Sequence, residues 1–426
     1  MHQGSFKFIH SADIHLDSPL KGLDRYEGAP ADRIRIATRV AFEAMIDMAL
    51  REEVAFVIIA GDLYDGDWRD YSTGMFFARQ MARLGEVGIP AFVVYGNHDA
   101  HSEITHALRL PPNVHAFPAD HADTHTLGDL QVALHGRSYG RRAETDDLSL
   151  TYPGPVEGCF NIGLLHTCVD QGHSGGHAPY APCSIKALAE WGYDYWALGH
   201  VHAHSVLHTT PHIVFSGNLQ GRHARETGPK GCVMVTVSGG RVTEIEHRPL
   251  DVVRWHHLRI DATDRDTPEQ LLHAIEEALD AAIERDERLH AVRLTLEGAC
   301  RAHQALVTAP EHWLHEIRAL ALGLYGHRVW LEKVQFHTRM VLDVEQALSR
   351  DDALGALLRA VSGDDEDSHS AQAVLEAARD ELMKLQYKIN AEFGGDFERV
   401  DLLRSDLVEQ ARSALLVRLL QLGEPI

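Results

Sequence analysis

The segment VAFVIIAGD (54–62) constrains the fold of this chain more than any other. Its residues are almost continuously apolar, a pattern typical of a strand buried on both faces, and the run ends in a glycine and a carboxylate. FKFIHSAD (6–13) and IPAFVVYGNHD (89–99) repeat this pattern. Helical apolar spacing lies between them, at 34–50 and 73–88. Strands that alternate with helices predict an α/β domain.

The character of the sequence changes twice along the rest of the chain. Five later apolar segments predict strands that close the first domain into layered sheets: 131–139, 161–167, 193–202, 212–218 and 231–238. Residues 251–345 alternate in the order βαβαβ, which predicts a small α/β cap domain. Residues 346–426 are acidic and helical in pattern, with GDDEDSHS as a linker. We therefore expect a layered sandwich at 1–250, the cap at 251–345 and a helical C-terminal tail at 346–426.

The composition limits the class of protein. The chain of 426 residues is 45% hydrophobic and 24% charged, as in soluble globular proteins. No apolar run approaches the length of a membrane-spanning helix, so we expect no contact with a membrane. Five scattered cysteines without a CxxC pair suit free thiols in a reducing compartment, and we expect the cytoplasm. The net charge of −22 counts against tight, unaided binding of DNA, because nucleic-acid binders usually carry a basic surface.

Polar motifs follow five of the predicted strands. They are Asp13-Ile14-His15, Gly61-Asp62, Gly96-Asn97-His98-Asp99, His166 and Gly199-His200-Val201-His202. In α/β sheets, functional groups gather just outside the carboxyl ends of the strands, so these five ends can converge on one crevice. Carboxylate, imidazole and amide oxygen together suit a borderline cation such as manganese, iron or zinc. The motifs therefore predict a site for two metal ions.

The ordered set DxH, GDxxD, GNHD, H and GHxH resembles the calcineurin-like metallophosphoesterase superfamily over residues 1 to about 205. Within it, the stretch GNLQGRHARETGPKGC (217–232) and the order of cap and tail are similar to the bacterial DNA-repair nucleases of the SbcD/YhaO type. The resemblance implies a metallo-dependent phosphatase-like sandwich and a hydrolase that uses two divalent ions. Manganese is the favoured ion, with iron or zinc as alternatives.

The resemblance also implies a role for each motif residue. One ion would be held by Asp13, His15, Asp62 and His202, and the second by Asp62, Asn97, His166 and His200. Asp62 would bridge the ions, since a carboxylate has two oxygens. His98 would stabilise the transition state or protonate the leaving oxygen, unless it only orients other groups.

Other residues near the motifs lie outside this ligand set. Part of the family has a histidine three positions after the bridging aspartate, where this chain has Asp65, which we expect to orient a ligand or a water. We expect Asp99 to position backbone amides and His204 to lie outside the ligand set. Arg137 and Arg222 each stand near other arginines and are candidate phosphate contacts, with solvated surface as the alternative.

Two functions are consistent with this sequence. The resemblance favours a DNA exonuclease or endonuclease in double-strand-break repair that forms a homodimer. Its C-terminal helices, with a leucine stripe at 403, 407, 415 and 419, would dock on an SMC-like coiled-coil ATPase or pack within the molecule. The alternative is a small-molecule phosphodiesterase or phosphatase with the same metals, which suits the acidic composition better. A purely scaffolding role is disfavoured by the complete ligand set.

Overall fold

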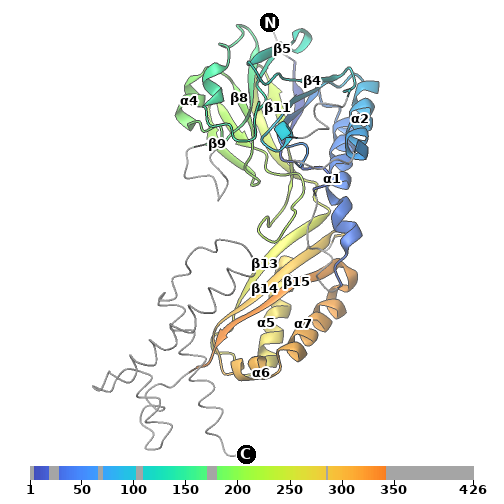
Figure 1. Cartoon of the computed structure of the whole chain (residues 1–426), viewed down its shortest axis with the longest axis vertical. Coiled ribbons are helices and arrows are strands. Elements are labelled where there is room, and N and C mark those ends of the chain that lie inside the picture. The colour runs from blue at the N-terminus through green and yellow to red at the C-terminus, as the bar shows by residue number, and fades with distance from the viewer. Residues whose placement is uncertain are drawn as a thin grey trace, which may run out of the picture. The chain divides into compact units, whose positions relative to one another are not determined.

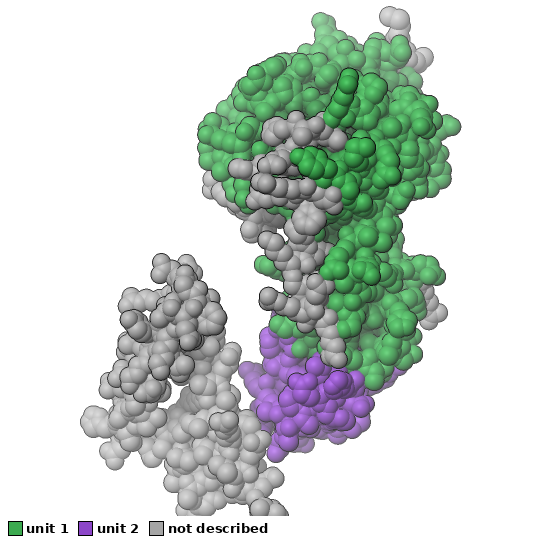
Figure 2. Space-filling model, turned by 45° about the vertical axis from the view of Figure 1, so that its right-hand side comes forward, with its two compact units in different colours: residues 1–258, 279–294, 318–334 green, residues 259–278, 295–317, 335–426 purple. Residues whose placement is uncertain are grey.

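The computed structural model describes residues 4–18, 28–65, 71–101, 109–169, 180–284 and 286–341. The chain divides into two compact units (Figure 2). The first contains 1–258, 279–294 and 318–334, and the second 259–278, 295–317 and 335–426. The helices and linker predicted after residue 346 lie outside the described residues. The predicted domain boundaries at 250 and 345 stay predictions.

The first of two six-stranded sheets in the first unit has the order β12-β11-β1-β2-β3-β4 (Figure 1). Strands β1 to β4 run parallel, and β11 is antiparallel to both β1 and β12. The strands are β1 (Phe6–Ser11), β2 (Phe56–Ala60), β3 (Ala91–Val94), β4 (Val114–Ala116), β11 (Gly231–Ser238) and β12 (Arg241–Pro249).

The second sheet has the order β5-β6-β7-β8-β10-β9. Strands β6, β7, β8 and β10 are parallel neighbours, and the edge strands β5 and β9 are antiparallel. The strands are β5 (Asp123–Leu127), β6 (Val132–Gly136), β7 (Phe160–His166), β8 (Tyr195–Gly199), β9 (Ser205–Thr209) and β10 (His212–Phe215). The carboxyl ends of the parallel strands in each sheet therefore share one edge.

Alternate residues of the central strands enter two separate apolar layers. Phe8 and Phe56 stack with ring centroids 4.9 Å apart, and Phe8 meets Tyr195 of the second sheet at 5.4 Å. Their neighbours Ile9 and Val57 pack instead with buried side chains of α1 (Ala31–Arg51) and α2 (Tyr71–Glu86). This alternation explains why the strands are apolar throughout.

Helices cover both outer faces of the paired sheets. Figure 1 shows α1 and α2 on one side of the sandwich and α4 (Ile185–Glu190) on the other. Helix α1 buries residues three or four positions apart, as its sequence pattern predicts: Ile34, Ala37, Thr38, Ala41, Phe42, Met45, Ile46, Met48 and Ala49. The predicted layered α/β sandwich is thus confirmed.

The segment after residue 250 forms a third sheet, with the order β13-β14-β15. Its elements are β13 (Val253–Asp261), α5 (Pro268–Ala282), β14 (Leu289–Ala299), α6 (His303–Thr308), α7 (Pro310–Tyr325) and β15 (Val329–Arg339). The predicted βαβαβ order is present, with the short helix α6 added. Four short 3-10 helices complete the described elements: Asp99–His101, Gly128–Leu130, Leu148–Thr151 and Gly326–Arg328. Among the helices that the structure describes, none has the length and apolar character needed to cross a bilayer.

Candidate metal centre

The predicted ligands lie where the carboxyl edges of the two large sheets meet. They follow or end β1, β2, β3, β7 and β8: Asp13, His15, Asp62, Asn97, His166, His200 and His202. Hydrogen bonds join the two edges. The amide of His200 donates to both carboxylate oxygens of Asp13, at 3.1 and 3.0 Å, and His166 Nδ1 lies 3.0 Å from the carbonyl oxygen of Ala60. The two sheets therefore hold one shared site.

Glycines in two of the motifs allow this close approach. A Cβ at Gly61 would lie 2.2 Å from His166 Nδ1, and Gly61 has a φ of +97° that side chains rarely adopt. A Cβ at Gly96 would lie 2.4 Å from Asp62 Oδ1. The GD and GN motifs therefore need their glycines because ligand side chains occupy the space of the missing Cβ.

Four of the predicted ligands have left-handed backbone conformations. The φ angles are 49° at Asp13, 47° at His15, 52° at Asp62 and 104° at His200. Each such residue costs on the order of 1–3 kcal/mol and persists only where the surroundings hold it. Here the amide of Asp13 donates to the Gly61 carbonyl at 2.9 Å, and that of His15 to the Asp62 carbonyl at 3.0 Å. Strain of this kind clusters at functional sites, as it does here.

The ligand atoms form three overlapping groups, in each of which they lie within 4.8 Å of one another. The groups are Asp13 with His15 and His202, Asp13 with Asp62 and His166, and His15 with Asp62 and His98. Asp62 Oδ2 lies 3.8 Å from His15 Nε2 and 3.5 Å from His166 Nε2. Asp62 thus stands between the two histidines that the resemblance assigns to different ions.

The remaining predicted ligands surround the same space. His166 Nε2 lies 3.0 Å from Asn97 Oδ1, and His15 Nε2 lies 3.4 Å from His202 Nε2. The ring of His200 packs against that of His166, with centroids 5.2 Å apart. His15 Nδ1 is buried without a hydrogen-bond partner among the described residues. Facing imidazole nitrogens beside two buried carboxylates fit divalent cations, which would offset the buried negative charge. The assignment of each residue to one ion stays a prediction.

Burial and charge set the protonation of these groups. Burial, aided by the nearby charge of Arg222, lowers the pKa of His15 to about 3, so its imidazole is neutral and able to bind a metal. For His166, burial acts to lower the pKa, but the charge of Asp62 has the larger effect. The net result is a pKa of about 9. Although burial opposes its charge, Asp62 has a pKa well below the usual range because His166, His15 and His98 face it.

The centre has an enclosed side and a partly exposed side. We call the enclosed side the buried group: Asp13, His15, Asp62, Asn97, His166 and His200. The partly exposed side, which we call the rim, consists of Asp65, His98, His202 and Arg222, with exposed fractions of 18%, 31%, 14% and 15%. Within the described part of the centre, the rim is therefore the side whose side chains are partly exposed to solvent.

His98 is held in the rim by two carboxylates. Its Nδ1 lies 2.7 Å from Asp65 Oδ1, and its amide donates to Asp62 Oδ1 at 2.9 Å. Burial lowers the pKa of His98, but the hydrogen bond to Asp65 and the charges of Asp62 and Asp65 raise it overall. Asp65, expected to orient a ligand or a water, orients His98 instead, and the hydroxyl of Ser18 donates to it.

Two residues of the loop between β10 and β11 contact the centre and were not predicted from the sequence. Glu226 Oε1 lies 2.8 Å from His202 Nδ1, and Oε2 accepts from the Asn218 side chain at 2.9 Å. Lys230 Nζ donates to the His202 carbonyl at 2.6 Å. Such second partners fix the ring orientation of a metal-binding histidine. The only available signal was the resemblance of 217–232, which assigns no role to single residues.

The structure also places the residues expected near the centre. Asp99 accepts from the amides of Leu63, Tyr64 and Gly96 at 3.1, 2.8 and 2.9 Å, which confirms its predicted role. Burial, followed by the charge of Asp62, raises the pKa of Asp99 to about 7.

His204 and Arg137 have partners elsewhere. His204 Nδ1 lies 3.0 Å from the carbonyl oxygen of Phe215, and its ring stacks on His247 with centroids 4.7 Å apart, so it lies outside the ligand groups as expected. Arg137 donates to the Ala119 carbonyl and to the Thr151 hydroxyl, at 3.2 and 3.1 Å. These contacts hold Arg137 within the protein, and its role as a phosphate contact stays a prediction.

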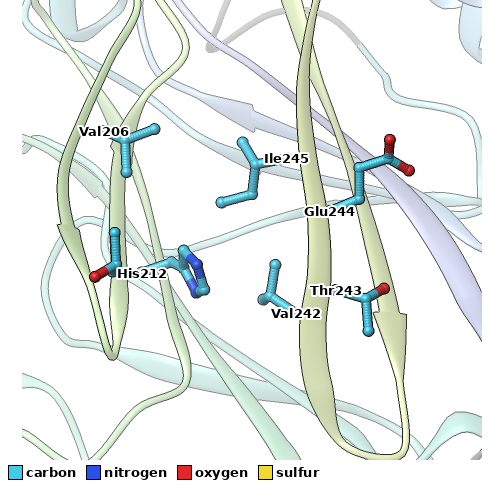
Figure 3. A pocket seen from close by; sticks show the side chains of 7 residues that line it. Val206, His212, Val242, Thr243, Glu244 and Ile245 are labelled. Atoms are coloured by element: carbon cyan, nitrogen blue, oxygen red, sulfur yellow. The ribbon is translucent and has the colours of Figure 1, made fainter.

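Two cavities have linings that share no residue with the metal centre. One of about 240 Å³ lies between strands β9 and β10 on one side and β12 on the other. Figure 3 shows Val206 and His212 facing Val242 and Ile245 across it. The other, of about 550 Å³, is lined by α1 residues and by 249–253 and 286–288.

Comparisons with known proteins agree with this geometry. Residues 6–204 match the family described as calcineurin-like phosphoesterase, and residues 255–339 match the middle domain of metallophosphoesterase YhaO. The chain is 34% identical over 313 residues to the uncharacterized metallophosphoesterase YhaO of Bacillus subtilis (strain 168), over 72% of this chain and 75% of that protein.

A solved structure, a dimetal phosphatase from Danio rerio, matches 57% of this chain and 99% of its own at 12% identity, with a TM-score of 0.34. That likeness is too low to add to the fold assignment. The family matches confirm the superfamily expected from the motifs, and with it a phosphoesterase whose described residues include candidate metal ligands. The chain belongs to the calcineurin-like metallophosphoesterases and is a homologue of YhaO.

Proposed function

We propose that this protein is a two-metal phosphodiesterase that cuts DNA in the repair of double-strand breaks. The observation that carries the hydrolysis is Asp62, which stands between His15 and His166 with His98 beside it. DNA as the substrate is supported by the motif set and by residues 217–232, which resemble the SbcD/YhaO-type repair nucleases. The YhaO middle domain that follows the phosphoesterase domain fits the same branch.

The chemistry follows from the residues present. The predicted ligands would hold two divalent cations, which would offset the phosphate charge and would ease the deprotonation of water near neutral pH. His98, whose protonated form is favoured by the hydrogen bond to Asp65, donates a proton to the leaving oxygen of the ester. Because its Nδ1 is engaged with Asp65, Nε2 is the nitrogen that faces the substrate. Asp99 holds the backbone from which the side chains of Asp62 and His98 project.

Several finer features belong to the same proposal. Manganese is the ion we favour, with iron or zinc as alternatives. The protein would act in the cytoplasm as a homodimer formed through its phosphoesterase domain. Its C-terminal helices, outside the described residues, would dock on an SMC-like coiled-coil ATPase, whose surface would compensate for the acidic charge of this chain.

A second candidate is a small-molecule phosphodiesterase or phosphatase. The net charge of −22 favours it, because a polyanion such as DNA is repelled by an acidic protein. The same two-metal site would serve both substrates.

The deciding experiment compares substrates. The manganese-loaded protein is assayed on linear duplex DNA, single-stranded DNA and bis-p-nitrophenyl phosphate, with and without an SMC-like ATPase. We expect all three to be cleaved by the wild type and none by a sample stripped of metal with chelator. Hydrolysis of the small ester alone, even with the ATPase present, would contradict the nuclease and favour the second candidate.

A further inference from the structure

Arg222 is the rim residue whose position the mechanism above does not explain. It lies in the loop between β10 and β11, and its side chain is 15% exposed beside Asp65 and His98. Its guanidinium contacts Asp65, which holds His98, and Glu226, which holds His202, so Arg222 belongs to the centre and not to distant surface. A guanidinium in this position needs a reason, because burying a charge is costly.

The contacts of Arg222 fix the side chain while leaving donors free. Its amide donates to Glu226 Oε2 at 2.8 Å, and Nη2 donates to Glu226 Oε1 at 3.3 Å. Nη1 lies 3.8 Å from Asp65 Oδ2, which is an ion pair but too long for a hydrogen bond. Nε is buried and has no hydrogen-bond partner within the described ranges. One edge of the guanidinium is thus anchored, and other N–H groups are available to a ligand.

Glu226 couples this anchor to the metal centre. The same carboxylate that binds Arg222 also lies 2.8 Å from His202 Nδ1. Both carboxylates next to Arg222 hold histidines of the rim, Glu226 holding His202 and Asp65 holding His98. Arg222 therefore contacts the carboxylates that hold a predicted metal ligand and the predicted proton donor, on the partly exposed side of the centre.

We propose that Arg222 binds a non-bridging oxygen of the substrate phosphate. Arginine suits this role because its planar fork of N–H donors matches the oxygens of phosphate and stays charged at any working pH. The inference rests on the proposed function only in taking a phosphate ester as the substrate. It assigns to the loop a substrate-binding residue, in addition to the positioning residue Glu226.

The test measures binding of inorganic phosphate to the full-length, manganese-loaded protein by calorimetry. Arg222→Gln removes the charge but keeps a polar group beside Asp65 and Glu226, and Arg222→Met removes both. The matched control is Arg225→Gln, because Arg225 is an exposed cation of the same loop. Manganese per chain and the thermal midpoint are measured for each variant. KM and kcat for bis-p-nitrophenyl phosphate are then compared.

We expect both Arg222 variants to bind phosphate about tenfold or more weakly and to show a matching rise in KM, with full manganese content. Arg225→Gln should stay within about twofold of the wild type. Unchanged phosphate affinity in Arg222→Gln would overturn the inference, and so would a fall in thermal midpoint alone. Loss of manganese in both variants would also overturn it, since Arg222 would then only support the ligands. If the wild type binds phosphate through Arg222 but cuts no DNA, the inference stands and the nuclease proposal fails.

Discussion

The buried group and the rim occupy two sides of one centre but are held in different ways. The buried group projects from the ends of five strands, and left-handed backbone and sheet hydrogen bonds fix its side chains. The rim is held by side chains of loops, with Glu226 and Asp65 each binding a histidine. The difference separates two tasks. The strand ends hold all the predicted ligands except the rim residue His202, and we infer that the other rim residues serve the substrate.

The contrast between the buried group and the rim predicts that substitution of Asp62 causes the largest loss of bound metal and turnover. Asp62→Asn should lose both ions and at least about a thousandfold in turnover, because each ion supplies several kcal/mol. Asparagine tolerates the φ of 52°, and its side-chain oxygen can still accept the hydrogen bond from the His98 amide. The substitution therefore tests the loss of the negative charge alone. Metal per chain is measured by elemental analysis. Asp129→Asn, at an exposed position, is the control. An Asp62→Asn protein that keeps two ions would contradict the role of Asp62 as a metal ligand.

At the rim residue His98, a change should affect chemistry and leave the metals bound. His98→Gln should lower kcat by about a hundred- to ten-thousandfold, the usual contribution of a proton donor, with unchanged metal content. His121→Gln alters an exposed histidine and serves as the control. Loss of an ion from His98→Gln would instead make His98 a ligand, which its proximity to His15 and Asp62 leaves open.

The buried group was predictable from the sequence because each ligand follows an apolar run that can only be an inner strand. Strands β2 and β7 are buried at every residue, and their ends carry Asp62 and His166. The edge strands β9 and β12 were not predicted, because they are mixed in polarity and half exposed. A strand packed on one side leaves a weaker pattern.

The rim was predictable only in part. His98, His202 and the partner of His98, Asp65, belong to motifs, but Glu226, the partner of His202, does not. Glu226 is 24 residues from His202 in the chain, and its loop has no periodicity from which the direction of a side chain could be inferred. Asp65 was expected to orient a ligand or a water, but its contact with His98 was not predicted, because it depends on how two loops meet. Contacts between loops depend on the assembled fold, and a single sequence does not show them.

Glu226 sharpens the comparison, since it is buried in contact with the rim residues Arg222 and His202, and His202 is a predicted ligand. Glu226→Gln should weaken metal affinity by about ten- to a hundredfold, because the carboxylate that orients His202 loses its charge. Excess manganese should restore most of the activity. The exposed Glu157→Gln is the control. A fall in kcat that manganese does not restore would show that Glu226 serves the chemistry and not the ligand.

The smallest predicted effect is the pH dependence of metal binding by the buried group. Burial lowers the pKa of His166, but Asp62 outweighs it and raises the value to about 9, so the metal-free protein carries a proton there at neutral pH. An ion must displace this proton, and affinity should therefore rise by up to about tenfold per pH unit from pH 7 and level off above pH 9. Calorimetry in buffers of different ionisation enthalpy should detect a proton released with the ion at pH 7.5. Affinity that is constant over this range would mean that His166 is already neutral, or that it binds no metal. His15, with a pKa of about 3, should contribute no such dependence.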